Sequence, residues 1–445
     1  MDPAHPAQLT ASEATAAIRE GSLRAQDLVQ ACLDRVDTVD SEVEAWAFLD
    51  RDYALEQARR LDDMHAAGLP KGPLHGVPVA VKDIVDTADM PTESGTVLLK
   101  GRRPAEDAAI VAMLRQAGAV IMGKTVTTEL ATYHPGKTRN PHDPSRTPGG
   151  SSSGSAAGVA SFQFPLAIGS QTNGSVLRPA SYCGVWGFKP TRGVTSRVGV
   201  LSQSPFLDIL GFFARDARDI ALITEALAVY DARDPQMRPR AKPPLVETVT
   251  QEPPMPPRLA FVRTPVWDQA DAHAHEAIEE LAGFLGDHVR EAVLPEAFAH
   301  AIDWHGTIME ADIARNYAAL YERGADKMSE SLRGQIERGR KTTAVAYNEA
   351  LSRVDLLNYG LAEMFEDFDA ILTLPVTGEA PVGLDSTGSP IFCTIWTLCG
   401  TPAVTVPVMQ GANGMPIGAQ LVGAPGDDAR LLRVAAWLAR LVEEG

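Results

Sequence analysis

Apolar and polar positions along this chain follow two repeating patterns, and each pattern predicts a different kind of secondary structure. Between residues 8 and 67 the apolar positions recur at helical spacing, and Thr10 with Glu13 three residues later forms the pattern of a capping box. The stretch GVPVAVKD at 76–83 has valine at alternate positions and the apolar density of a buried strand. From 106 to 118 the spacing is again that of a helix with one apolar face.

Strand and helix patterns then alternate to the end of the chain. Short apolar runs predict strands at 164–169, at 258–265 and at three places between 369 and 425. Helical spacing predicts helices at 156–160, 216–230, 273–365 and 429–444. This alternation favours an α/β fold, here a single large domain in which helices cover both faces of a central mixed β-sheet.

The segment GAVIMGKT, from Gly118 to Thr125, matches the phosphate-loop pattern G-x-x-x-x-G-K-[ST]. A phosphate loop follows a strand and exposes its backbone N–H groups to an anion. Here the four middle residues, 119–122, are all apolar and predict a buried strand, and Gly118 is placed to end the helix before it. We therefore expect a helix, a cap and a strand in this segment, without a nucleotide.

Charge narrows the range of partners. The 445 residues include 40 Lys and Arg against 57 Asp and Glu, a formal net charge of −17, and no long basic run. This balance disfavours nucleic acid as a partner, because a phosphate backbone would be repelled. The N-terminal stretch lacks the apolar region of a signal peptide, and no run reaches the length of a membrane span. We therefore expect a cytoplasmic protein with no membrane partner.

Residue types that often bind metals show no familiar spacing. The four cysteines fit neither a zinc ribbon nor a CxxC pair, and the ten histidines form no HExxH motif. The cysteines are Cys32, Cys183, Cys393 and Cys399. We expect them to be buried thiols, and we expect neither a metal nor a cofactor.

Nucleophilic chemistry is best sought in two stretches that are rich in small residues. They are TPGGSSSGSAAG at 147–158 and IGSQTNGSVLRPASYCGVWGFKPT at 168–191. Within the first, GSSSG fits the G-x-S-x-G nucleophile elbow with Ser152 at its centre. An elbow serine needs an apolar strand just before it, whereas residues 140–149 contain three prolines. We therefore do not expect Ser152 to be the nucleophile.

Both stretches resemble those of the amidase signature family, and the resemblance extends over most of the chain. The blocks that carry it, in family order, are LHGVPVAVKDIVDT (74–87), GAVIMGKTVTTELA (118–131), TRNPHDPSRTPGGSSSGSAAGVA (138–160), the 168–191 stretch, FDAILTLPVTGEAP (368–381) and GTPAVTVPVMQGANGMPIGAQLVG (400–423). The resemblance implies one domain over 1–445, divided into a helical N-terminal segment (1–67), a catalytic core (74–215), a proline-rich surface connection (234–257) and the rest of the sheet (258–445), with substrate-side helices at 273–365.

The family uses a Ser–Ser–Lys triad, and each member can be carried over to this chain. The resemblance implies that Ser175 is the nucleophile, that Ser151 is the bridging serine and that Lys82 is the base. In the family a cis peptide bond precedes the bridging serine. The implied oxyanion-hole donors are the backbone N–H groups of Thr172, Asn173, Gly174 and Ser175.

The implied triad is chemically consistent. A serine hydroxyl is a weak nucleophile until a base removes its proton, and a lysine can be that base only when it is neutral. Burial lowers the pKa of a lysine, and Lys82 ends an apolar strand. An inward-pointing Asp83 would oppose deprotonation, so we expect it to point away. We expect Lys124, which also follows an apolar run, to belong to the scaffold.

Two departures from the common family pattern lie beside the nucleophile. Asn173 stands where many members have glycine, and we expect the loop to survive because asparagine tolerates unusual backbone angles. Arg178, in QTNGSVLRPA, resembles the malonamidase-like branch, in which such an arginine can grip a substrate carboxylate. The alternative is that Arg178 braces the loop through backbone carbonyls or Asp208. Tyr133 is the other candidate substrate-binding residue.

The sequence therefore predicts an amidohydrolase that cleaves the C–N bond of a small or aryl amide through a Ser175 acyl-enzyme. Esters, anilides and carbamates are related substrates, because each passes through a tetrahedral oxyanion. The alternative is a glutaminase subunit of a tRNA-dependent amidotransferase, which belongs to the same family. The intact triad disfavours a binding protein without activity. We expect a small-molecule amide as the partner, and we leave open whether the protein is a homodimer.

Overall fold

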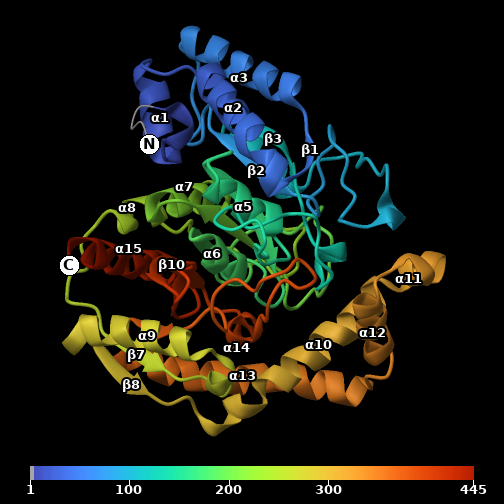
Figure 1. The fold of residues 1–445 in the computed structure, drawn as a ribbon, viewed down its shortest axis with the longest axis vertical. Coiled ribbons are helices and arrows are strands. Elements are labelled where there is room, and N and C mark those ends of the chain that lie inside the picture. Colours follow the sequence, from blue (N-terminus) through green and yellow to red (C-terminus); the bar gives the residue numbers. More distant parts are fainter. Residues whose placement is uncertain (1–4) are drawn as a thin grey trace.

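The computed structural model describes residues 5–445, which form one mixed sheet of eleven strands (Figure 1). The strands are β1 (Trp46–Leu49), β2 (Pro78–Lys82), β3 (Val120–Thr125), β4 (Leu166–Gln171), β5 (Trp186–Lys189), β6 (Ile209–Ala214), β7 (Leu259–Val262), β8 (Val289–Ala292), β9 (Ala370–Thr373), β10 (Ala403–Gln410) and β11 (Pro416–Val422). Their order is β1-β3-β2-β4-β6-β5-β10-β11-β9-β7-β8. Strand β2 is parallel to β3 and β4, and β7 is parallel to β8 and β9, whereas the other neighbours are antiparallel.

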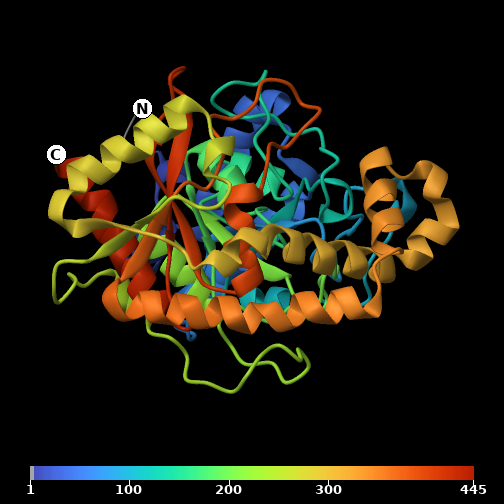
Figure 2. The same cartoon turned by 90° about the horizontal axis from the view of Figure 1, so that it is seen from below.

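Helices cover both faces of the sheet, which confirms the predicted α/β fold. They are α1 (Ala11–Glu20), α2 (Ala25–Val43), α3 (Arg51–Ala66), α4 (Ala109–Gln116), α5 (Ser153–Ala160), α6 (Leu177–Cys183), α7 (Ala217–Leu227), α8 (Leu245–Val249), α9 (Ala272–Leu285), α10 (Ala301–Asn316), α11 (Ala318–Gly324), α12 (Glu330–Gly339), α13 (Ala344–Asp367), α14 (Ile391–Cys399) and α15 (Asp428–Glu444). Figure 1 shows α1 to α3 at one end of the molecule and α9 to α13 at the other, and Figure 2 shows α13 running beneath the sheet.

Side-chain alternation along β2 decides which face of the sheet receives the candidate lysine. Val79 and Val81 pack in one core cluster with residues of α4 and α7, whereas Ala80 packs in another with residues of α2 and α5. Lys82 follows Ala80 by two residues, so its side chain points toward α5. Because β2 and β4 are parallel neighbours, Lys82 and Ser170 lie close together at the C-terminal ends of these two strands.

The segment GAVIMGKT has the structure that its apolar pattern predicts. Helix α4 ends at Gln116, Gly118 has a φ of 82°, and β3 is buried along its whole length. The expected helix, cap and strand are therefore confirmed. The capping box of Thr10 and Glu13 is also present at the start of α1.

Seven α-helices and strands were not predicted. Four of them, α6, β5, β6 and α14, lie in stretches for which no element was expected. The other three lie inside segments that were expected to have a different structure. Strand β1 lies within the N-terminal helical segment, β8 lies within the helical region 273–365, and α8 lies within the proline-rich stretch 234–257. Strands β1 and β8 are the two edges of the sheet, only four residues long and partly exposed. Such short edge strands have a weak apolar signal, which explains why they were missed.

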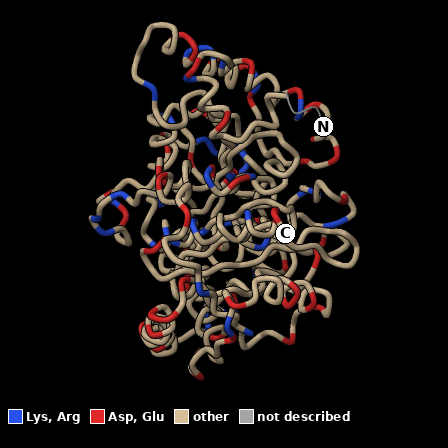
Figure 3. Tube along the Cα trace, turned by 90° about the vertical axis from the view of Figure 1, so that its left-hand side faces the viewer, with Lys and Arg blue, Asp and Glu red and all other residues tan. Residues whose placement is uncertain are grey.

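Acidic and basic residues are interspersed along the Cα trace (Figure 3). The net charge of −17 is therefore distributed rather than gathered in one region. Within residues 5–445, none of the helices combines the length and the apolar character needed to cross a membrane.

Candidate active site

Lys82 is fully buried at the end of β2 and donates two hydrogen bonds from its side-chain nitrogen. Its Nζ lies 2.7 Å from Ser151 Oγ and 2.8 Å from Ser170 Oγ. Burial lowers the pKa of Lys82 well below its usual 10.5, an effect that Asp208 opposes and Arg178 reinforces. A neutral amine has two N–H groups and a lone pair, so in that state Lys82 can accept a proton from one of these hydroxyls while it donates to the other.

Ser151 stands just before α5, and the peptide groups on both sides of it are held in place. The Gly150–Ser151 bond is cis, and its carbonyl oxygen accepts a 2.7 Å hydrogen bond from Arg178 Nη2. The Ser151 carbonyl accepts a 3.2 Å hydrogen bond from the N–H of Thr128. Helix α5 packs against β2, β4 and α6. These contacts keep the Ser151 hydroxyl next to Lys82.

Ser175 lies in the loop between β4 and α6 and is 8% exposed. Within residues 5–445 its hydroxyl makes no hydrogen bond, so in this structure it is not bonded to the Ser151 hydroxyl. In the same part of the chain, the N–H groups of residues 172–175 have no acceptor. The loop therefore presents four consecutive free donors beside the Ser175 hydroxyl, an arrangement that can bind an oxyanion.

Gln171, the last residue of β4, holds the end of this loop that follows Ser175. Its Oε1 accepts hydrogen bonds from the N–H groups of Val176 at 2.8 Å and Leu177 at 3.0 Å. Its Nε2 donates a 2.9 Å hydrogen bond to Thr397 Oγ1 on α14. Sequence reasoning did not single out Gln171, and the only available signal was a polar residue at the end of an apolar strand.

Asn173 fits the loop for a different reason from the one expected. Among residues 5–445 the positions with positive φ do not include Asn173, so backbone tolerance is not needed. Instead its Oδ1 accepts a 2.6 Å hydrogen bond from Thr394 Oγ1, and its Nδ2 donates a 3.3 Å hydrogen bond to the Tyr133 hydroxyl. Gly174 is required for space, because a Cβ there would lie 2.9 Å from Cβ of Pro390.

Arg178 is 1% exposed and braces the segment before Ser151. Besides the carbonyl of Gly150, its guanidinium binds the carbonyl of Gly388 at 3.0 Å and Thr387 Oγ1 at 3.2 Å. The brace therefore runs through backbone carbonyls, as one alternative expected, and not through Asp208. Roles for Arg178 and Tyr133 in substrate binding stay predictions.

Three other sequence candidates are held within the fold. Asp83 points away from Lys82, as expected, because its carboxylate lies 3.2 Å from Lys124 Nζ. Lys124 is itself fully buried in β3. The Ser152 hydroxyl lies 3.3 Å from both the N–H and the carbonyl oxygen of Ser170. Each of these groups already has a partner, which fits a structural role.

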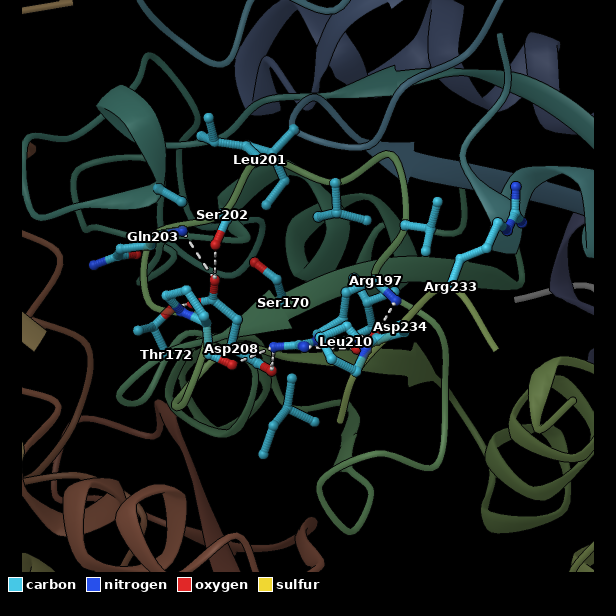
Figure 4. A pocket seen from close by; sticks show the side chains of 17 residues that line it. Ser170, Thr172, Arg197, Leu201, Ser202, Gln203, Asp208, Leu210, Arg233 and Asp234 are labelled. Atoms are coloured by element: carbon cyan, nitrogen blue, oxygen red, sulfur yellow. Dashed lines mark hydrogen bonds and ion pairs between the residues drawn. The ribbon is translucent and has the colours of Figure 1, made fainter. Parts of the chain in front are cut away.

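A cavity of about 250 Å³ reaches this region (Figure 4). Ser170, Thr172 and Asp208 are among the residues that line it, and much of its wall is apolar. Asp208 Oδ1 accepts a 2.7 Å hydrogen bond from Thr172 Oγ1, and burial raises the pKa of Asp208 to about 6. Ser175 does not line this cavity, so we place the chemistry at the loop. The contact of Ser170 with Lys82 and the hydrogen bond from Thr172 to Asp208 were not predicted. Both join segments that are distant in the sequence.

Comparisons with known proteins assign the chain to a family. The profile of the Amidase family matches residues 27–432. The chain belongs to the Amidase family. It is 34% identical to a glutamyl-tRNA(Gln) amidotransferase subunit from Cutibacterium acnes, across 98% of this chain and 95% of that relative.

Solved structures of Amidase-like proteins share the fold. One comes from a vestigial protein complex described in connection with the origins of an s-triazine catabolic enzyme; it has a TM-score of 0.90, 26% identity and 98% coverage of each chain. Another is the peptide amidase from Stenotrophomonas maltophilia, with a TM-score of 0.85, 28% identity and coverage of 98% of this chain and 97% of that one. As an Amidase family member, this chain is a hydrolase that acts on carbon–nitrogen bonds.

Proposed function

We propose that this protein hydrolyses an amide through an acyl-enzyme on Ser175, with Ser151 and Lys82 carrying the proton. The observation that supports this most is the run of four free N–H donors at 172–175 beside the Ser175 hydroxyl. The 2.7 Å contact between Lys82 Nζ and Ser151 Oγ supplies a buried base for the same site.

The proposed reaction has two halves. In the first, Ser175 gives its proton to Ser151 while Ser151 gives its own to neutral Lys82, and Ser175 Oγ bonds to the amide carbon. The carbonyl oxygen becomes an oxyanion that the free N–H groups stabilise. The C–N bond then breaks as Ser151 protonates the leaving amine and regains a proton from Lys82. In the second half, water attacks the acyl-enzyme by the same proton transfers and releases the acid and Ser175.

The identity of the amide has two candidates. Near full-length similarity to a glutamyl-tRNA(Gln) amidotransferase subunit favours glutamine, in which case the chain is the glutaminase part of a larger complex. Similarity to a peptide amidase, together with Asn173 and the Val176-Leu177 pair, supports a free-standing amidohydrolase for other small amides. The comparisons support the glutaminase candidate more strongly.

The chemistry is tested by intact mass after exposure to a fluorophosphonate, for the wild type and for Ser175→Ala, Ser151→Ala and Ser152→Ala. We expect one adduct that is absent in Ser175→Ala, slowed in Ser151→Ala and unaffected in Ser152→Ala. An adduct that persists in Ser175→Ala and disappears in Ser152→Ala would contradict the proposed nucleophile.

The substrate is tested by giving the purified chain glutamine and a panel of amides, anilides, esters and carbamates. Turnover of panel members without any partner would establish a free-standing amidohydrolase. Glutamine hydrolysis that appears only when the other components of an amidotransferase are added would establish the glutaminase candidate.

A further inference from the structure

The loop with the candidate oxyanion donors is held by hydrogen bonds to its carbonyl groups. Three consecutive carbonyls each accept one: Thr172 from His305 Nε2 at 2.9 Å, Asn173 from Thr397 Oγ1 at 2.5 Å, and Gly174 from the N–H of Arg178 at 3.1 Å. Two of these donors come from distant helices, His305 from α10 and Thr397 from α14.

These carbonyl contacts determine where the free N–H groups point. A trans peptide is planar, and its C=O and N–H project in opposite directions. The Thr172 carbonyl shares a peptide unit with the N–H of Asn173, and the next two carbonyls likewise share units with the N–H groups of Gly174 and Ser175. A donor bound to each carbonyl therefore holds the N–H of that unit on the opposite side. The three carbonyl bonds thus account for three of the four free donors.

His305 is suited to this contact. It is 1% exposed, and burial lowers its pKa to about 4, so the ring is neutral at physiological pH. A neutral imidazole has a single N–H, and the Thr172 carbonyl can only accept, so the proton must be on Nε2. The histidine is therefore a fixed donor to the loop.

The Thr397 hydroxyl is also committed to the loop. Its oxygen lies 2.5 Å from the Asn173 carbonyl oxygen, closer than the Cys393 carbonyl oxygen at 3.2 Å, so its one proton is donated to Asn173. The same hydroxyl oxygen accepts the 2.9 Å hydrogen bond from Gln171 Nε2. Thr397 thus links the side chain of Gln171 to the peptide group between Asn173 and Gly174.

We propose that His305 and Thr397 are positioning residues that keep the peptide groups of the oxyanion loop from rotating. Donors that are already oriented stabilise a developing charge without reorganisation during the reaction. Neither side chain needs to touch the reacting atoms, because each acts through a carbonyl on the far side of the loop. This inference rests on the proposed role of Ser175.

The test compares Thr397→Val, which loses the hydroxyl, with Thr397→Ser, which keeps it. Direct loss of an oxyanion donor lowers kcat by about 10² to 10³-fold, so we expect an indirect loss of about tenfold in Thr397→Val. Affinity for a boronic acid, which forms a tetrahedral adduct on Ser175, should fall by a similar factor. Affinity for the product carboxylate should change little, and Thr397→Ser should restore both losses.

A matched control separates positioning from stability. Thr373 is equally buried in β9 and donates a 2.9 Å hydrogen bond to the Val262 carbonyl, away from the loop. Thr373→Val should lower the free energy of unfolding about as much as Thr397→Val while leaving kcat unchanged. If Thr397→Val does not fold, His305→Leu against His305→Gln gives the same comparison of a lost and a retained donor.

The outcomes distinguish the two proposals. Unchanged kcat and boronate affinity in Thr397→Val, with the wild type still labelled on Ser175, would overturn only the positioning role. Failure of Thr397→Ser to restore activity would overturn it as well. A wild type with no adduct on Ser175 would overturn the proposed function, and this inference with it.

Discussion

The guanidinium of Arg178 donates a 2.7 Å hydrogen bond to the carbonyl oxygen of Gly150, the residue that precedes Ser151. Arg178 also lies in the first turn of α6, the helix that follows Ser175, and its N–H bonds to the Gly174 carbonyl. One residue therefore connects the segment of the candidate bridging serine to the loop of the candidate nucleophile. Its substitution should affect both.

Arg178→Ala is expected to lower the free energy of unfolding and the rate of acylation together. Loss of the donor leaves the buried Gly150 carbonyl unsatisfied, at a cost of about 1–3 kcal/mol. Urea unfolding and the kinetics of a neutral amide would measure the two effects, and KM for that amide should change little. A loss confined to amides that carry a carboxylate would instead show that Arg178 binds substrate.

Lys82→Met is expected to abolish acylation while stabilising the fold at pH 7. The folded-state pKa of Lys82 lies well below 10.5, so at neutral pH the unfolded chain binds the proton more tightly and burial of the lysine costs stability. Methionine removes this cost, and its advantage should shrink as the pH rises toward 10.5. Unfolding measured at several pH values checks the sign. A variant that is less stable than the wild type at pH 7 would argue against a neutral Lys82.

Asp208→Asn is expected to shift the acidic side of the pH–rate profile for acylation to lower pH. The Asp208 charge raises the pKa of Lys82, so its removal should let the lysine stay neutral in more acidic solution. Fluorophosphonate labelling rates from pH 5 to 9 would measure the shift. A shift to higher pH would mean that Asp208 helps to deprotonate the lysine.

Gln171→Leu is expected to lower kcat with little change in KM. It leaves the buried N–H groups of Val176 and Leu177 without their acceptor, which should also cost about 1–3 kcal/mol of stability for each group. Gln171→Glu keeps an acceptor for both groups and serves as the comparison in steady-state kinetics. Equal activity in the two variants would show that these bonds do not position the loop.

Gly174→Ala is expected to impair acylation strongly, because its Cβ would lie 2.9 Å from Pro390 Cβ and 3.2 Å from Cys393 Cβ. The loop would have to shift, and with it the free N–H groups. Gly283 in α9 is the matched control, since a Cβ there meets nothing within 4 Å. Gly283→Ala should keep full activity and gain about 0.5–1 kcal/mol of stability. Labelling rates of the two variants give the comparison.

The fold was largely predictable from the sequence, because its signals are local. The apolar run before Lys82 predicted a buried strand, and the structure has one there. The assignment of Ser151 and Ser175 rests on the family-like blocks around them and stays a prediction. Lys124 was correctly placed in the scaffold, since four apolar residues precede Gly123 and indicate a strand.

The contacts that orient the site were not predictable in the same way. His305 and Thr397 are separated from Thr172 and Asn173 by 133 and 224 residues, and nothing in a helical pattern says which carbonyl a side chain meets. Asn173 shows the same limit, because its own conformation was expected to matter and a partner on α14 matters instead. Local sequence specifies elements, whereas the pairing of distant elements specifies donors and acceptors.

Lys82, Ser151 and Ser175 all lie within residues 78–176, from β2 to the start of α6, whereas the helices α10 and α14, which contact the loop, come from residues 301–399. This division has a consequence for protein engineering. A library that varies exposed positions of α10 but retains His305 would leave the candidate catalytic groups and this contact with the loop unaltered. Recombination at the proline-rich stretch 234–257 would exchange α10 and α14 together with the strands β7 to β11, and would leave Lys82, Ser151 and Ser175 in place.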